Sequence, residues 1–354
     1  MKKRMTVIVM TSSMCNIDCV YCYMKASRKN VHEIDVSAIP VLIDHCSADF
    51  DEVEFCWHGG EPLMVGKEFY RSAIRAQQKI TALRGTEFRN VMQTNGLLLD
   101  EEWVDLLKDA NISFGFSFDA PPEIHALHRG DNAQKVIAAW ELVRSANLPV
   151  GAICVISKYN VHKAREIFDF FSAQNIRSYS FLPLRAVPAP ALPPIPDNQE
   201  LFELFRDTFN LWSSRENDIV SIEPLSTMIQ ALINNKPQLC SFSGSCPDTM
   251  ISIDQDGNVV PCCSLVEDKF VMGNIFADPL AWILEHKKGP LVQLRKIAVA
   301  NSCVDCEYLP ICNGGCRADA YWETGRYDGK YPYCETRKLT FAYLKNQLER
   351  FGVI

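Results

Sequence analysis

The amino-acid sequence predicts an α/β fold: a partial (β/α)6 barrel of the TIM type, followed by a small cysteine-rich domain. Three observations support this prediction. Apolar, β-forming runs alternate with amphipathic segments through the first half of the chain, a proline-rich stretch follows, and nine of the fifteen cysteines lie between residues 240 and 334. With 354 residues, the chain is long enough for more than one domain.

Six runs carry the strand pattern of the predicted barrel: residues 5–11, 52–58, 88–94, 112–118, 149–156 and 177–182. Helical patterns lie between them, for example over 68–83 and 134–146. Strand–helix units that repeat about every 30 residues indicate parallel strands buried on both faces. Six units are too few for a complete eight-stranded barrel, so we expect a partial one, with its chemistry at the carboxyl ends of the strands.

A proline-rich segment ends the barrel. Residues 183–197 contain six prolines, which exclude a helix or a central strand there. The next segment, 202–212, places aromatic side chains on one helical face, a pattern typical of packing. We therefore expect the barrel over residues 1–190, a bridging proline-rich segment with helices over 191–235, and the cysteine-rich domain over 236–354, with a C-terminal helix at 335–351.

The composition excludes several classes of function. Hydrophobic residues make up 47% and charged residues 22% of the chain, a globular balance, and the formal net charge of −7 with one short basic cluster disfavours nucleic-acid binding. The N-terminus has no apolar signal segment, and no apolar run is long enough to span a membrane. The sequence predicts a cytoplasmic protein that binds neither nucleic acid nor membrane.

The number of cysteines indicates metal. A secreted disulfide scaffold would be shorter and would carry a signal segment, so fifteen cysteines in this chain favour metal ligation. Cys46, Cys56 and Cys154 stand alone inside apolar stretches, where we expect buried core residues.

Three cysteines follow the first predicted strand: Cys15, Cys19 and Cys22. Three thiolates on such a loop can hold three irons of a 4Fe–4S cube and leave the fourth iron open for a substrate or cofactor. A zinc site is the alternative, but it requires a fourth ligand, and the nearest histidine is His32.

With this spacing, with Tyr21 before the last cysteine and with HGGEPLM at 58–64 after the second strand, the chain resembles the radical S-adenosylmethionine superfamily. QTNG at 93–96 and SFD at 117–119 also match family motifs at the ends of the third and fourth strands. The resemblance implies that S-adenosylmethionine binds here, with contacts from Tyr21, Gly59, Gly60, Glu61, Pro62, Gln93, Asn95, Ser117, Asp119 and Arg129. A role as turn-forming polar residues is the alternative for Ser117, Asp119 and Arg129, and we interpret His125 and His128 as surface or capping residues.

The later cysteines resemble the SPASM extension of the same superfamily, and eight of them suffice for two 4Fe–4S clusters. Similarity to the anaerobic sulfatase-maturating enzymes implies an interleaved ligand set. A first auxiliary cluster would use Cys240, Cys246, Cys262 and Cys316. A second would use Cys303, Cys306, Cys312 and Cys334. The implied cofactors are thus three 4Fe–4S clusters and S-adenosylmethionine; a zinc ribbon is the alternative for residues 303–316.

Cys263 is left over from this assignment. If residues 258–265 are extended, its side chain lies opposite that of Cys262 and simply packs there. In the sulfatase-maturating group, the residue after this ligand is an acid that serves as a base. Here it is a thiol; in addition, Met24 follows Tyr23, and His58 replaces the Gln that precedes GGEP in that group. These differences favour the peptide-modifying members of the superfamily.

The resemblance implies a radical enzyme that cleaves S-adenosylmethionine reductively and abstracts hydrogen from a substrate C–H bond. Our first prediction is oxidative crosslinking of a ribosomally made peptide. The alternatives are a redox-neutral epimerase of a peptide or small molecule with Cys263 as its catalytic hydrogen-atom donor, a sulfatase-maturating dehydrogenase that forms formylglycine, and a non-catalytic iron–sulfur electron carrier.

The expected partners are a peptide or small-molecule substrate and an external one-electron reductant of the flavodoxin or ferredoxin type. Because the first strand begins by residue 5, leaving no room before it for a peptide-binding domain, a separate peptide-recognition protein is a further expected partner.

Overall fold

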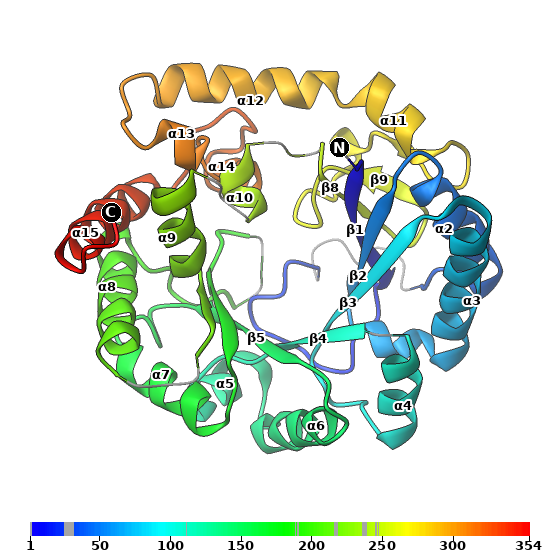
Figure 1. Ribbon diagram of the computed structural model, residues 1–354, viewed down its shortest axis with the longest axis horizontal. Coiled ribbons are helices and arrows are strands. Elements are labelled where there is room, and N and C mark those ends of the chain that lie inside the picture. Colours follow the sequence, from blue (N-terminus) through cyan, green and yellow to red (C-terminus); the bar gives the residue numbers. More distant parts are fainter. Residues whose placement is uncertain are drawn as a thin grey trace.

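A computed structural model describes residues 2–24, 32–110, 112–187, 189, 191–215, 219–235, 239–244, 246 and 248–354. Within these residues ten strands form one sheet, in the order β10-β9-β8-β1-β2-β3-β4-β5-β6-β7. The sheet curves into an open ring with the helices along its outer side (Figure 1). This is the predicted partial barrel.

The first six strands pair in parallel, each with the next along the chain. All six lie within a residue or two of their predicted positions: β1 (Arg4–Ser12), β2 (Glu52–Gly59), β3 (Glu87–Thr94), β4 (Ile112–Ser117), β5 (Val150–Ile156) and β6 (Ser178–Pro183). A seventh parallel strand, β7 (Ser221–Glu223), follows β6. Three residues are too few to show a strand periodicity, so the sequence analysis missed it.

The predicted helices at 68–83, 134–146, 202–212 and 335–351 are confirmed as α3, α6, α8 and α15. Reciprocal hydrogen bonds between Asp197 and Glu200 cap the start of α8. The helices that the structure describes include none long and apolar enough to cross a lipid bilayer. Their bounds are α2 (Ile39–Ser47), α3 (Lys67–Arg84), α4 (Glu101–Asp109), α5 (Pro122–Arg129), α6 (Ala133–Ser145), α7 (Ala164–Ala173), α8 (Asn198–Ser214), α9 (Leu225–Asn234), α10 (Cys240–Ser243), α11 (Leu280–Lys287), α12 (Gly289–Ser302), α13 (Leu309–Cys312), α14 (Arg317–Thr324) and α15 (Cys334–Arg350), with 3-10 turns η1 (Val36–Ala38), η2 (Pro62–Val65) and η3 (Asp268–Phe270).

The strands have two different faces. On β2, Phe55 and Trp57 are buried against the outer helices, and Trp57 packs edge-on against Phe69 and Tyr70 of α3. The alternate residues of β2, including Cys56 and His58, face the inside of the ring and are only half-buried. The prediction that Cys56 is a core residue is therefore wrong, whereas Cys46 and Cys154 have 0% exposure and belong to the core.

The cysteine-rich domain extends the barrel sheet. Its strand β8 (Met250–Ile253) pairs in parallel with β1, and β9 (Asn258–Val260) and β10 (Gly273–Asn274) continue from it in antiparallel. At the opposite end of the sheet, Tyr343 of α15 packs against Phe202 and Phe209 of α8, which confirms that this aromatic face is a packing face. The domain therefore joins both ends of the open sheet (Figure 1).

Two predicted domain boundaries cannot be placed on the structure, because residues 190 and 236 lie outside the described residues.

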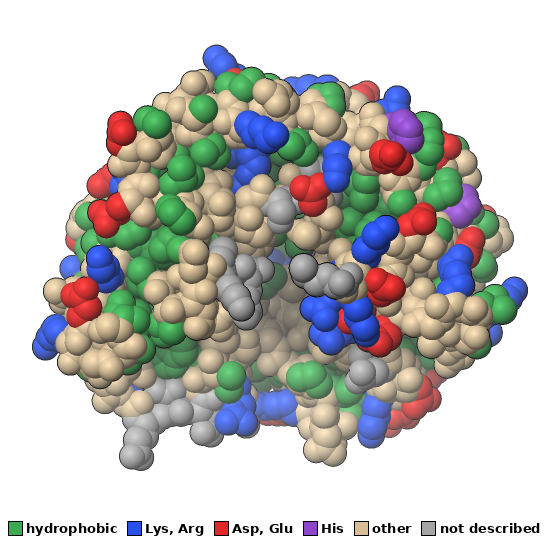
Figure 2. All heavy atoms as spheres, turned by 45° about the horizontal axis from the view of Figure 1, so that its top comes forward, with side chains coloured by type: hydrophobic (Ala, Val, Ile, Leu, Met, Phe, Trp, Pro, Cys, Tyr) green, Lys and Arg blue, Asp and Glu red, His purple; other side chains and the backbone are tan. Residues whose placement is uncertain are grey.

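The surface carries charges of both signs. Lys and Arg side chains alternate with Asp and Glu side chains over the face in Figure 2, which is hollowed near its centre.

Candidate functional site

The loop that holds Cys15, Cys19 and Cys22 is clamped by the loop after β2. The Gly60 N–H donates to the Ser12 carbonyl and the Glu61 N–H to the Met14 carbonyl, both at 2.7 Å. A Cβ at residue 60 would lie 1.8 Å from the Met14 carbonyl oxygen, so only glycine permits this contact. The preceding Gly59 has a φ of +121°, which an L side chain rarely adopts. The two glycines thus fix the position of the cysteine loop.

Glu61 joins this loop to the end of β3. Its Oε1 accepts from the Leu63 N–H at 3.1 Å and from the Thr94 hydroxyl at 2.7 Å, and its Oε2 accepts from the Asn95 N–H at 2.9 Å. The side chain is 1% exposed, and burial raises its pKa although these donors favour the carboxylate. Both carboxylate oxygens accept hydrogen bonds from the protein, so Glu61 holds the loop after β2 against the end of β3.

The QTNG segment reaches the same place from β3. Asn95 donates through Nδ2 to Asn16 Oδ1 at 2.7 Å, inside the cysteine loop. Two residues earlier, Gln93 donates to the Ser117 hydroxyl at 2.8 Å across β3 and β4. Gly115 makes room for this pair, since a Cβ there would lie 2.4 Å from Gln93 Oε1. The predicted residues of the first four strands are thus brought together at their carboxyl ends.

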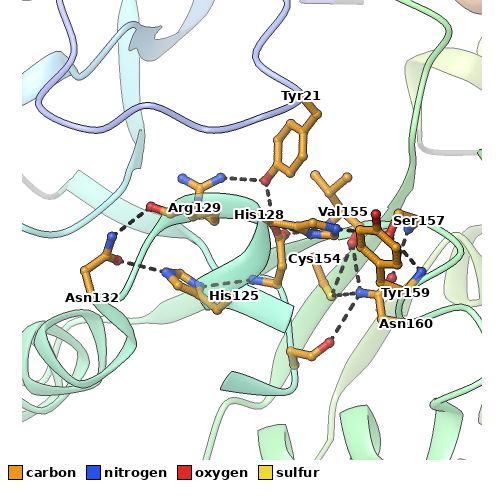
Figure 3. Close-up of polar contacts among 12 residues, drawn as sticks. Tyr21, His125, His128, Arg129, Asn132, Cys154, Val155, Ser157, Tyr159 and Asn160 are labelled. Atoms are coloured by element: carbon orange, nitrogen blue, oxygen red, sulfur yellow. Dashed lines mark hydrogen bonds and ion pairs between the residues drawn. The ribbon is translucent and has the colours of Figure 1, made fainter. Parts of the chain in front are cut away.

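A buried network joins the cysteine loop to β4 and α5 (Figure 3). The Tyr21 hydroxyl donates to Asp119 Oδ2 at 2.6 Å and accepts from Arg129 Nη1 at 2.8 Å. Asp119 Oδ1 accepts from the Val155 N–H at 2.8 Å, and His128 Nδ1 lies 3.1 Å from Oδ2. Burial opposes ionisation of Asp119, but the His128 hydrogen bond and the Arg129 charge together lower its pKa. Asp119 therefore positions Tyr21 and His128.

Our interpretation of His125 and His128 as surface or capping residues is wrong. Both are 0% exposed. His128 Nε2 lies 3.0 Å from the Ser157 hydroxyl, and His125 Nε2 lies 2.9 Å from Asn132 Oδ1. The ring nitrogens of each imidazole therefore have polar partners inside the network of Figure 3. This arrangement depends on contacts between separate segments of the chain.

Arg129 retains a donor for a ligand. The side chain is 9% exposed, and among the described residues its buried Nε has no hydrogen-bond partner. A guanidinium that is buried beside a protein network and still has an unpaired donor fits an anionic group such as a carboxylate. Of the predicted cosubstrate residues, Arg129 is thus the one whose surroundings fit direct contact most clearly.

Eight of the nine later cysteines line two cavities. One is lined by Cys240, Cys246, Cys262 and Cys316, and the other by Cys303, Cys306, Cys312 and Cys334. This is the partition that the resemblance to sulfatase-maturating enzymes implied. Each group of sulfurs surrounds a space instead of meeting at one point, which fits a four-iron cube better than a single zinc ion.

Cys263 does not lie on an extended segment. Strand β9 ends at Val260, and the Leu265 N–H closes a turn by donating to the Cys262 carbonyl at 2.9 Å. Cys262 lines the first cysteine cavity, and the Cys263 thiol is a neighbour of the Cys56 thiol on the inner face of β2. Tyr23, which directly follows Cys22, is also a neighbour of Cys263. The expectation of a strand with opposed neighbours is therefore wrong, and Cys263 lies toward the inside of the barrel.

The other two departures lie nearby. Met24 is buried at 5% exposure. The His58 side chain lies on the inner face of β2, where its Nδ1 accepts from the Gly59 N–H at 2.7 Å, and burial lowers its pKa to about 4. Its imidazole is therefore neutral near pH 7 and carries its proton on Nε2.

The sequence analysis missed Arg185, which follows β6. Its Nε pairs with Asp319 of α14 and its Nη1 donates to the Ser264 hydroxyl, next to Cys263. Arg185, Asp319 and Cys262 line a cavity of about 250 Å³ between the inner face of the barrel and the cysteine-rich domain. An arginine just after the carboxyl end of a strand was the available signal, hidden by the surrounding prolines.

Comparison with protein families matches residues 9–171 to the Radical SAM superfamily and residues 240–307 to SPASM, an iron–sulfur cluster-binding domain. The cysteine-type anaerobic sulfatase-maturating enzyme of Clostridium perfringens is 27% identical, with 94% of each chain covered. The serine-type enzyme of Bacteroides thetaiotaomicron is 25% identical, with 88% of this chain and 82% of the relative covered.

Solved structures share the fold. The structure of anSMEcpe with bound AdoMet and Cp18Cys peptide is 23% identical, has a TM-score of 0.86 and covers 99% of both chains. SuiB of Streptococcus suis bound to the precursor peptide SuiA is 17% identical, with a TM-score of 0.68 over 94% of this chain and 75% of that one.

Proposed function

Because the chain belongs to the radical S-adenosylmethionine superfamily and carries a SPASM domain, we propose that it oxidises a side chain of a peptide substrate by two electrons. The observation that carries the proposal is the pair of complete four-cysteine sets. Fully ligated auxiliary clusters have no open iron for a substrate and suit electron transfer. When bound, the front cluster and S-adenosylmethionine supply hydrogen-atom abstraction, and the auxiliary clusters accept the electron that remains.

The front cluster would be held by Cys15, Cys19 and Cys22. Gly60 and Glu61 clamp that loop, with Gly59 and Pro62 on either side of them in the chain. Tyr21, held by Asp119, positions Arg129 toward the cosubstrate carboxylate, and Gln93 and Ser117 present polar atoms on the inner face. The first auxiliary cluster would lie beside the barrel interior and the second farther along the SPASM domain.

The proposed reaction is the oxidation of a Cys or Ser side chain. It removes one C–H hydrogen atom, one electron and the S–H or O–H proton, and leaves a C=S or C=O bond. Relatives named as cysteine-type and serine-type sulfatase-maturating enzymes support this reaction over crosslinking, our first prediction from the sequence. A substrate other than a sulfatase would fit the departures at Met24, His58 and Cys263, which set this chain apart from that group.

The test is turnover of short Cys- and Ser-containing peptides by the anaerobically reconstituted, reduced enzyme. We expect 5′-deoxyadenosine in step with a peptide aldehyde, trapped by a hydrazine reagent and located by tandem mass spectrometry. From a Cys peptide the aldehyde forms when water replaces the sulfur of the C=S bond and hydrogen sulfide is released. A peptide that has lost two hydrogens without becoming trappable would indicate crosslinking. Cosubstrate cleavage without any change of mass would contradict oxidation.

Epimerisation is a second candidate, favoured by the position of the Cys263 thiol toward the barrel interior. A thiol S–H is weak enough to return a hydrogen atom to a carbon radical, so the product would keep the mass of the substrate.

Replacing Cys263 with Ala separates the two candidates. If Cys263 takes up the substrate proton during oxidation, we expect the variant to cleave S-adenosylmethionine but to form about a hundredfold less product, the lower end of a general base's contribution. In deuterated water the wild-type product would then carry no new C–D bond. One deuterium per product in the wild type, lost in the variant, would contradict oxidation and support epimerisation. Cys46→Ala, at a buried core cysteine of α2, is the control.

A further inference from the structure

A buried arginine of α15 contacts both auxiliary cysteine sets. Arg337 of α15 is 7% exposed. Its Nη1 donates to the Cys312 sulfur at 3.4 Å and to the Ser241 carbonyl at 3.1 Å, and its Nη2 donates to the Ser241 hydroxyl at 3.1 Å. Cys312 lines the cavity of the second set, whereas Ser241 directly follows Cys240 of the first. The guanidinium thus contacts one set through a sulfur and the other through the residue beside a ligand.

Two aromatic rings fix the guanidinium. Its carbon lies 3.7 Å from the centroid of the Phe242 ring and 4.4 Å from that of Tyr331. Rings on the guanidinium hold its planar donors in one orientation, because cation–π contact favours a cation over the ring faces. The hydrogen bond to Cys312 therefore has a fixed direction and is little exposed to water.

The charge of Arg337 is not paired with a carboxylate among the contacts that the described residues provide: its partners are a sulfur, a carbonyl, a hydroxyl and two rings. A reduced cluster carries one more negative charge than an oxidised one, so an unpaired buried cation and an N–H donor on a ligand sulfur both favour reduction. Arg337 supplies both features to the second set.

We propose that Arg337 is a positioning residue that raises the reduction potential of the second auxiliary cluster. The second cluster would then be a better acceptor for an electron than it would be without Arg337. This proposal rests on the proposed function only in its use of two auxiliary clusters, and it holds for either substrate chemistry.

The test is an anaerobic redox titration followed by electron paramagnetic resonance. Replacing Cys15, Cys19 and Cys22 with Ala removes the front signal and leaves the two auxiliary clusters in the full-length chain. In this background we expect Arg337→Gln to lower one of the two midpoint potentials by about 59 mV, a tenfold fall in that cluster's equilibrium constant for reduction. The other midpoint changes less. Lys345→Gln, which removes an exposed charge farther along α15, leaves both midpoints nearly unchanged.

Arg337→Lys separates charge from geometry. It keeps the positive charge but loses the planar fork, so we expect a smaller shift in the same direction. If Arg337→Gln binds less iron than the background protein, the midpoint potentials of Arg337→Lys test the proposal in its place. Midpoints that are unchanged in a fully loaded Arg337→Gln or Arg337→Lys variant overturn the proposal. Because no peptide is present, failure of the substrate assignment would not affect this result.

Discussion

A Cys19→Ala variant is expected to reduce formation of 5′-deoxyadenosine to background and to lower the bound iron by about a third, one cluster of three. Cys19 is 8% exposed in the loop after β1, and Arg129 is among its charged neighbours. Without its thiolate the cube keeps two protein ligands, which do not hold it against loss to solvent. Iron and sulfide content and chromatographic detection of 5′-deoxyadenosine measure the effect.

Cys46→Ala is the matched control. Cys46 is 0% exposed in α2, where it packs in the core. Its loss is expected to cost about 1 kcal/mol of unfolding free energy and to leave iron content unchanged. A Cys19→Ala protein that retains full iron and wild-type 5′-deoxyadenosine formation would remove this cysteine from the front site.

A Gly60→Ala variant is expected to lose S-adenosylmethionine binding although it changes no ligand. Its new Cβ would lie 1.8 Å from the Met14 carbonyl oxygen, so one of the two loops must move. The move breaks the hydrogen bonds Gly60–Ser12 and Glu61–Met14. Overpacking and two lost hydrogen bonds together cost about 3 to 5 kcal/mol. Equilibrium binding of S-adenosylmethionine and thermal unfolding of the reconstituted protein report the two effects.

Gly289→Ala provides the comparison. This glycine begins α12, has no described atom within 4 Å of an added Cβ and does not have a positive φ. Alanine favours a helix by about 1 kcal/mol over glycine, so the melting temperature should stay equal or rise slightly. Equal cosubstrate affinity in Gly60→Ala and wild type would show that the clamp has no role in binding.

Local patterns predicted the barrel well. The six runs of alternating or continuous apolar residues became β1 to β6 because a strand's side-chain period is set by its own backbone. The short strand β7 and the strands β8 to β10 were missed. They contain few residues, and pairing with β6 and β1 stabilises them more than their own composition does.

The roles of individual polar residues were harder to predict. The GGEP motif was evident from the sequence. In the structure, however, the Glu61 carboxylate accepts hydrogen bonds from Leu63, Thr94 and Asn95 of the same chain. The same holds for Asp119, which binds Tyr21 and Val155. A polar side chain at a strand end can face a ligand or a neighbouring loop, and only the packing of loops against one another distinguishes these cases.

The sequence by itself determined the front cysteine motif and the motifs that carry the resemblance to the superfamily, because ligand spacing within a loop is a local property of the chain. The division of the later cysteines into two sets, with Cys263 as the surplus thiol, was what the resemblance implied. The tertiary structure decided the rest: that Cys56 faces the barrel interior, that Gly60 makes room for Met14, and that Arg337 lies between two cysteine sets. These contacts join residues far apart in sequence. They exist only because the folded chain packs its loops and helices against one another.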